Sequence, residues 1–232
     1  MLIGGLQKHS LIDYPGKVSC VLFLSGCNFD CPYCHNPELV KRELWRGPYL
    51  SQTDVLEFLE RRIGLLEGVV ISGGEPTLQK DLGLICEKIQ DLGYPIKLDT
   101  NGSRPKVIKR LFDDGLVDYV ALDIKTDPFR YKSIISRNFD PEWILSSIRI
   151  IMESTVTYEF RTTCVKSIVD DRIIEDIAKS IKGGSRYVLQ RFCDHRVLNP
   201  GYFEKVASTF GEHELLHLKS VAEQWVNQCI IR

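Results

Sequence analysis

The feature that most constrains the fold of this chain is a regular alternation of short apolar, β-rich runs with amphipathic helical patterns. The apolar runs occupy residues 18–24, 68–72, 96–100, 119–124, 158–163 and 186–192. Helical patterns follow from Ser51, which starts a capping box with Asp54, and at about 80–92, 105–114, 141–152, 170–181 and 212–226. Such alternation predicts an α/β fold in which helical crossovers join parallel strands. Periodicity alone fits an open sheet as well as a barrel, and residues 229–232 offer one more edge strand.

Length and charge restrict the class of protein further. The 232 residues predict a single domain, 1–232, and 44% hydrophobic with 26% charged residues is typical of a globular protein. The net charge of -1 gives no basic field for nucleic acid or an anionic membrane. No apolar run approaches the ~20 residues that span a bilayer, and the first residues do not resemble a secretory signal. We therefore expect a cytoplasmic protein without a membrane or nucleic-acid partner.

Three of the eight cysteines, Cys27, Cys31 and Cys34, lie on one loop after the first apolar run. A structural zinc site needs four ligands, and His35 follows Cys34 too closely to turn back onto the same metal. A four-iron cluster held by three thiolates keeps one iron open for an exogenous ligand. Two alternatives stay open for these cysteines: a zinc site completed by a distant ligand, and buried thiols that bind no metal. The remaining cysteines are predicted to be buried structural residues: 20, 86, 164, 193 and 229.

The cysteine spacing, with Tyr33 just before the third thiol, resembles the radical S-adenosylmethionine (SAM) superfamily. The string from Gly26 to Asn36 resembles the activating enzymes of glycyl radical enzymes. Residues 5–16 resemble the anaerobic ribonucleoside-triphosphate reductase activating proteins. The resemblance implies a partial (β/α)6 barrel, SAM, and a 4Fe-4S cluster on the three thiols with Tyr33 beside it. No cysteine lies between Cys34 and residue 72, so a single cluster is expected.

Residues 72–75, Ser-Gly-Gly-Glu, follow the second apolar run and precede Pro76. Taken alone, they describe an ordinary strand-to-helix turn whose glycines let the backbone approach a ligand. The resemblance implies that this segment binds the methionine amino group of SAM. Its predicted cofactor-binding residues are Ser72, Gly73, Gly74 and Glu75.

Polar side chains also end the next strands, where parallel α/β folds bind ligands. Turn formation and surface charge explain them equally well. The resemblance implies that Asp99, Thr100 and Asp123 lie near a monovalent cation beside SAM. It also implies that five residues contact SAM: Thr100, Asn101, Asp123, Lys125 and Gln190. Arg161 and Arg191 are interpreted either as cavity residues or as a solvated rim, and no catalytic side chain is assigned.

The resemblance implies reductive cleavage of SAM to methionine and a 5'-deoxyadenosyl radical. In the activase interpretation, this radical takes hydrogen from a glycine of a partner glycyl radical enzyme, and anaerobic ribonucleotide reductase is the first candidate. The electron comes from a flavodoxin or ferredoxin-type donor. Two alternatives stay open: a radical SAM enzyme acting on a small molecule or RNA, and a noncatalytic iron-sulfur or zinc protein.

Overall fold

The computed structural model describes residues 1–41, 44–135, 139–204 and 208–232, which form one eight-stranded sheet in sequential order. Strand β1 is antiparallel to β2, and all later neighbours are parallel. The strands are β1 (Ile3–Ser10), β2 (Ser19–Leu24), β3 (Gly68–Gly73), β4 (Ile96–Thr100), β5 (Tyr119–Asp123), β6 (Thr157–Cys164), β7 (Tyr187–Arg191) and β8 (Cys229–Ile231).

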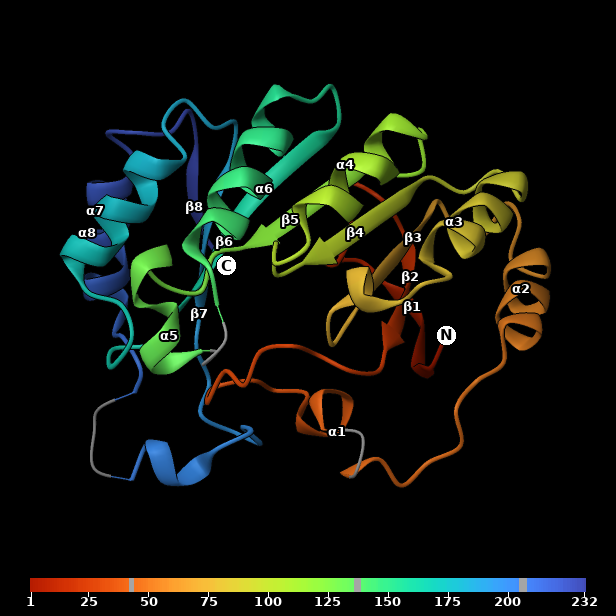
Figure 1. The fold of residues 1–232 in the computed structure, drawn as a ribbon, viewed down its shortest axis with the longest axis horizontal. Coiled ribbons are helices and arrows are strands. Elements are labelled where there is room, and N and C mark those ends of the chain that lie inside the picture. Colours follow the sequence, from red (N-terminus) through yellow and green to blue (C-terminus); the bar gives the residue numbers. More distant parts are fainter. Residues whose placement is uncertain (42–43, 136–138, 205–207) are drawn as a thin grey trace.

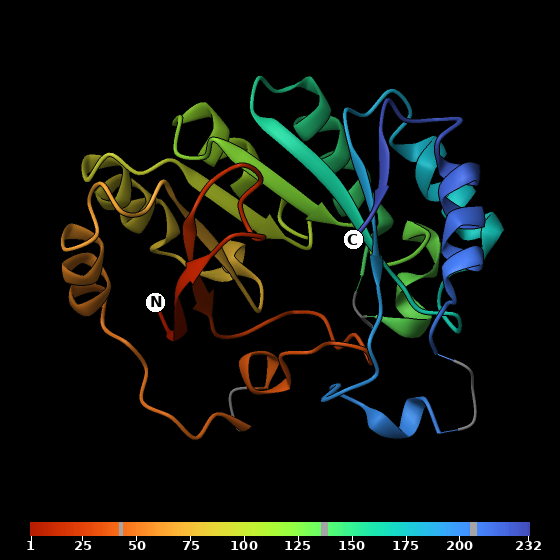
Figure 2. The same ribbon diagram turned by 180° about the vertical axis from the view of Figure 1, so that it is seen from behind.

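Helices connect the parallel strands and most of them cover one face of the curved sheet, while α1 lies apart from that layer, as Figures 1 and 2 show from opposite sides. They are α1 (Pro37–Val40), α2 (Gln52–Glu60), α3 (Leu82–Asp91), α4 (Pro105–Asp113), α5 (Tyr131–Ile134), α6 (Pro141–Glu153), α7 (Asp171–Ser180) and α8 (Glu212–Ala222). Short 3-10 turns are η2 (Pro76–Leu78), η3 (Pro128–Arg130) and η4 (Pro200–Tyr202). Among the described residues, β1 and β8 are the two free edges, so the sheet is an open, partial barrel.

Local sequence signals start these helices where the side chains predict. The Ser51 hydroxyl accepts from the Asp54 amide at 3.0 Å while the Asp54 carboxylate accepts from the Ser51 amide at 3.1 Å, which is the predicted capping box of α2. Asp140 and Asp170 cap α6 and α7 by accepting from one backbone amide each, that of Glu142 and that of Ile173, and Pro141 occupies the first turn of α6. The helices therefore begin at fixed points relative to the strand ends that precede them.

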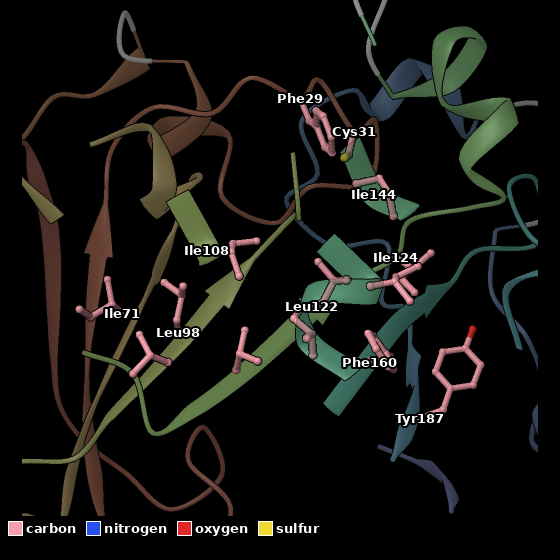
Figure 3. Close-up of a cluster of buried hydrophobic side chains, with 14 of the residues drawn as sticks. Phe29, Cys31, Ile71, Leu98, Ile108, Leu122, Ile124, Ile144, Phe160 and Tyr187 are labelled. Atoms are coloured by element: carbon pink, nitrogen blue, oxygen red, sulfur yellow. The ribbon is translucent and has the colours of Figure 1, made fainter. Parts of the chain in front are cut away.

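The sheet carries a different hydrophobic cluster on each face. On the helix-covered face, strand residues such as Leu98 and Leu122 pack against helix residues such as Ile108 and Ile144 (Figure 3). The opposite face carries a small cluster in which Tyr14, from the loop between β1 and β2, packs on Tyr119 with ring centroids 5.8 Å apart. Val21 and Val70 complete this cluster. The loop therefore closes the base of the partial barrel.

The six predicted apolar runs correspond to β2 through β7, and the predicted edge strand is β8. Strand β1 was not predicted, because its sequence contains two glycines and a polar half, Gln7-Lys8-His9. Its strand structure comes from pairing with β2, where Leu6 lies opposite Leu22. In the part of the chain that the structure describes, no helix is both long and apolar enough to cross a membrane.

Candidate cofactor site

A cavity of about 340 Å³ opens at the carboxyl ends of the parallel strands. It brings together all the residues that the sequence nominated except Glu75. The nominated lining residues are Cys27, Cys31, Tyr33, Cys34, Ser72, Gly73, Gly74, Asp99, Thr100, Asn101, Asp123, Lys125 and Gln190. Cys27 and Gln190, which are 163 positions apart in the chain, therefore meet at one site, because the strand ends and the cysteine loop after β2 lie at the same edge of one sheet.

The cysteine loop is held by its own backbone and by aromatic packing. The Cys34 amide donates to the Cys31 carbonyl at 3.0 Å, and Phe29 packs edge-on against Tyr131 with ring centroids 5.7 Å apart. Cys31 is buried, while Cys27 and Cys34 are half-buried. All eight cysteines are free thiols, so the three on the loop are available as ligands.

Burial raises the pKa of the Cys27 thiol to about 12, and it also raises the pKa of Cys31 and Cys34 above the usual thiol value. Thiolates at these positions therefore need a nearby positive charge, which iron or another metal supplies. Among the described residues, no compact group of His, Cys, Asp or Glu side chains could enclose a single metal ion. The His35 Nδ1 lies 3.1 Å from the His195 carbonyl oxygen.

The two glycines after β3 are required by neighbouring backbone. Gly73 has φ +111°, and a Cβ there would lie 2.5 Å from the Leu24 amide nitrogen. A Cβ on Gly74 would lie 2.2 Å from the Gly26 carbonyl oxygen. The close approach lets the Gly74 amide donate to Leu24 at 2.8 Å and the Glu75 amide donate to Gly26 at 2.8 Å. The glycines thus fix the start of the cysteine loop against the end of β3.

Glu75 lies behind the cavity wall, fully buried. Its carboxylate accepts from the Thr77 amide at 3.0 Å, the Thr100 hydroxyl at 2.8 Å and the Asn101 amide at 2.7 Å. The side chain therefore ties the turn after β3 to the end of β4. Asn101 in turn donates to Asn28 Oδ1 at 3.1 Å, which extends this hydrogen-bonded frame to the cysteine loop.

Charged side chains that are buried or partly buried form another part of the lining. Arg161 Nε lies 2.6 Å from Asp123 Oδ1, and Lys125 Nζ lies 3.0 Å from Asp123 Oδ2. Arg161 Nη1 is 3.4 Å from Asp99 Oδ1, which also contacts the ammonium of Lys97. Burial by itself raises the pKa of both aspartates, but the adjacent Arg161 and lysine charges outweigh it and hold both pKa values below the usual range. Both carboxylates are therefore ionised at neutral pH.

Several features of the site lie outside what the sequence indicated. Arg161 lines the cavity, whereas Arg191 is exposed and does not. Lys97 was missed because it interrupts an apolar strand, although its spacing of two residues from Asp99 puts both side chains on one face. The prediction that Cys193 is buried is wrong, because β7 ends at residue 191 and leaves this thiol exposed. The hydroxyl of Tyr33 is buried in the cavity wall without a hydrogen-bond partner among the described residues.

One relative matches this chain over its whole length, and another matches most of it. A Methanocaldococcus jannaschii protein inferred to be a glycyl-radical enzyme activating enzyme is 38% identical over 100% of this chain and 95% of the relative. The pyruvate formate-lyase-activating enzyme of Streptococcus mutans is 27% identical over 80% of this chain and 75% of its own.

Two solved structures show the same fold. Streptococcus suis SuiB, bound to its precursor peptide SuiA, superposes on 91% of this chain with a TM-score of 0.69 and 14% identity. This chain spans 48% of SuiB. The TYW1 structure with a lysine-pyruvate adduct superposes on 89% of this chain and 72% of its own, with a TM-score of 0.60 and 17% identity. The family model of the radical SAM superfamily matches residues 21–179, which is more than half of the sequence. The chain belongs to the radical SAM superfamily and is an enzyme of its glycyl-radical enzyme activating group.

Proposed function

We propose that this enzyme generates a glycyl radical on a partner protein, and that the partner is an anaerobic ribonucleotide reductase. The single observation that carries the proposal is the arrangement of three free thiols from one loop around a polar cavity at the strand ends. The family implies SAM and a 4Fe-4S cluster, and the names of the relatives indicate a glycyl radical enzyme as the target. The choice of partner rests on the resemblance of residues 5–16 alone.

The residues present fit both cofactors. Cys27, Cys31 and Cys34 would hold three irons and leave the fourth for SAM. The Tyr33 hydroxyl, which has no hydrogen-bond partner among the described residues, offers a hydrogen bond within the same cavity. When bound, the two cofactors supply one-electron cleavage of the sulfonium and a 5'-deoxyadenosyl radical. The protein's share is to bind, orient and exclude water.

Four segments would divide the recognition of SAM among them. The end of β3 (Ser72, Gly73, Gly74) would face the amino group, and Lys125 would face the carboxylate or ribose. Thr100 and Asn101 lie at the end of β4, Asp123 ends β5 two residues before Lys125, and Gln190 lines the cavity from β7. Glu75 would act indirectly, because its carboxylate holds Thr100 and Asn101 in place.

Residues 196–199 are held against the cysteine loop and α1, although they lie far from both in the chain. The Leu198 amide donates to the Cys34 carbonyl at 2.9 Å, and the Asn199 amide donates to Pro32 at 3.0 Å. Arg196 Nη2 forms an ion pair with Glu38 at 3.0 Å. Because the sheet is open between its edge strands in the described structure, a glycine-bearing loop of a partner could reach the cavity from the side. This opening favours a protein substrate over a small molecule that needs a sealed site.

Anaerobic reconstitution with iron and sulfide, followed by SAM and dithionite, tests the cofactor part of the proposal. We expect 5'-deoxyadenosine, and we expect Cys27→Ala, Cys31→Ala and Cys34→Ala each to abolish it. Cys86→Ala is the matched control, since this thiol is buried in α3 outside the cavity. A full cluster without any 5'-deoxyadenosine would refute the assignment.

The partner is tested separately, with the reconstituted enzyme and an anaerobic ribonucleotide reductase. Electron paramagnetic resonance should show a glycyl radical doublet that requires SAM. A flavodoxin or ferredoxin-type donor should replace dithionite in this reaction. If 5'-deoxyadenosine forms but no protein radical appears, the enzyme acts on another target, and a small molecule or RNA becomes the leading alternative.

A further inference from the structure

Each carboxylate oxygen of the two aspartates at the ends of β4 and β5 already has a hydroxyl or a positively charged partner in the described structure. Asp99 Oδ2 accepts from the Ser72 hydroxyl at 3.1 Å, and Asp99 Oδ1 contacts Lys97 and Arg161. Asp123 Oδ1 faces Arg161 Nε at 2.6 Å, and Asp123 Oδ2 faces Lys125 Nζ. These are the residues that the sequence nominated for a monovalent cation. In the structure, ammonium, guanidinium and hydroxyl groups occupy their oxygens.

The sheet register puts Arg161 in reach of both aspartates. Asp123 of β5 and Arg161 of β6 are direct neighbours, so their side chains leave the sheet on the same face. Asp99 of β4 is the neighbour of Ala121 on β5. The small Ala121 side chain leaves room for the guanidinium to pass over β5 from β6 to β4. Arg161 therefore joins three strands through two ion pairs.

Glu159, which also lies on β6 two residues before Arg161, is neutralised by other partners. Glu159 receives the Arg232 guanidinium at 3.3 Å and the Tyr119 hydroxyl at 3.1 Å. It lies 4.0 Å from Arg161 Nη1, farther than either aspartate. Apart from Glu159 and Arg232, the charge cluster around Arg161 contains three positive groups, Lys97, Lys125 and Arg161, and two negative ones, Asp99 and Asp123. Its formal charge is therefore +1.

We propose that Arg161 serves as the resident cation of this site, so that the enzyme binds SAM without a monovalent metal ion. The inference rests on the proposed function, since it concerns the SAM site. An added Na⁺ or K⁺ would have to share oxygens that already pair with Arg161, Lys125 or Ser72, and it would raise the local formal charge to +2, which repulsion from the adjacent partly buried cations opposes. Thr100, the third nominated ligand, already donates its hydroxyl to Glu75 at 2.8 Å. The surplus positive charge suits the carboxylate of SAM.

The first test uses the wild-type enzyme with its cluster reconstituted. SAM affinity is measured by calorimetry without reductant in NaCl, KCl and tetramethylammonium chloride at equal ionic strength. We expect the three dissociation constants to agree within about twofold. Equilibrium dialysis against Rb⁺, with no SAM present, should show no stoichiometric binding. Affinity that falls about tenfold or more in tetramethylammonium, or one Rb⁺ bound per chain, would overturn the proposal.

The second test removes the guanidinium. Arg161→Met leaves two carboxylates without their shared partner, so we expect a thermal midpoint that rises with K⁺ in a saturable manner while tetramethylammonium has no effect. Arg191→Met is the control, because this arginine is exposed at the end of β7, and its midpoint should show no K⁺ dependence.

A folded Arg161→Met protein whose thermal midpoint does not change with K⁺ would contradict the proposal. If the variant does not fold, the SAM affinities and Rb⁺ dialysis of the wild-type enzyme decide. Dialysis and thermal midpoints need no SAM. They therefore judge this inference even if the enzyme fails to cleave SAM.

Discussion

Replacing Glu75 with alanine should destabilise the fold although the residue does not line the cavity. The carboxylate accepts four hydrogen bonds, from the amide and hydroxyl of Thr77, the hydroxyl of Thr100 and the amide of Asn101. Glu75→Ala leaves all four donors buried without this acceptor. The two hydroxyls can rotate to other acceptors, but the two amides cannot. At ~1–3 kcal/mol for each unsatisfied group, the amides alone cost about 2–6 kcal/mol.

Part of this cost is offset because the native carboxylate is itself desolvated. Burial raises the pKa of Glu75, and the hydrogen bonds from Thr77, Asn101 and Thr100 counteract only part of that effect. We therefore expect a loss of about 3 kcal/mol in the free energy of unfolding. At ~2–4 °C per kcal/mol for a chain of this length, the melting temperature should fall by about 6–12 °C. Glu75→Gln keeps one acceptor oxygen and should lie between alanine and wild type.

The assay is urea unfolding of the reduced apoprotein, followed by far-ultraviolet circular dichroism and extrapolated to water. Glu60→Ala provides the control, since Glu60 is exposed at the end of α2. Its unfolding free energy should stay within about 0.5 kcal/mol of wild type. A loss below about 1 kcal/mol for Glu75→Ala would refute the argument, because it falls short of even one unsatisfied buried amide.

Three further perturbations probe other parts of the structure. Gly74→Ala should separate the cysteine loop from β3, because the new Cβ would lie 2.2 Å from the Gly26 carbonyl oxygen. The variant should therefore bind less iron after reconstitution, and an unchanged iron content would contradict this. Iodoacetamide should modify the exposed Cys193 of the folded apoprotein well before the buried Cys86, because burial raises the pKa of Cys86 to about 12. Peptide mass spectrometry measures the two rates, and equal rates would contradict the structure. Because the folded pKa of Asp123 is depressed, its stabilisation is present above its unfolded pKa of ~3.9 and is lost as pH falls further. Asp123→Asn should therefore flatten the acid side of the stability profile measured by urea unfolding, and an unchanged profile would contradict the ion pairs.

The sequence by itself determined the order of strands β2 to β8 and the place of the cofactor loop. Apolar runs of strand length, separated by capped amphipathic helices, leave few arrangements other than parallel strands with helical crossovers. The spacing of Cys27, Cys31 and Cys34 is a local property, so it was readable before any folding. The strand-end positions of Asp99 and Asp123 were readable for the same reason.

Tertiary structure decided what those side chains contact. Strand β1 exists because β2 offers it a partner, and nothing in its own apolar pattern indicates it. Glu75 turned out to hold the ends of β3 and β4 together, since its hydrogen-bond donors lie up to 26 residues away. Arg161 reaches Asp99 only because the sheet register places the small Ala121 between β4 and β6. Contacts between strands depend on register and side-chain volume, and neither quantity is written in the spacing of residues along one strand.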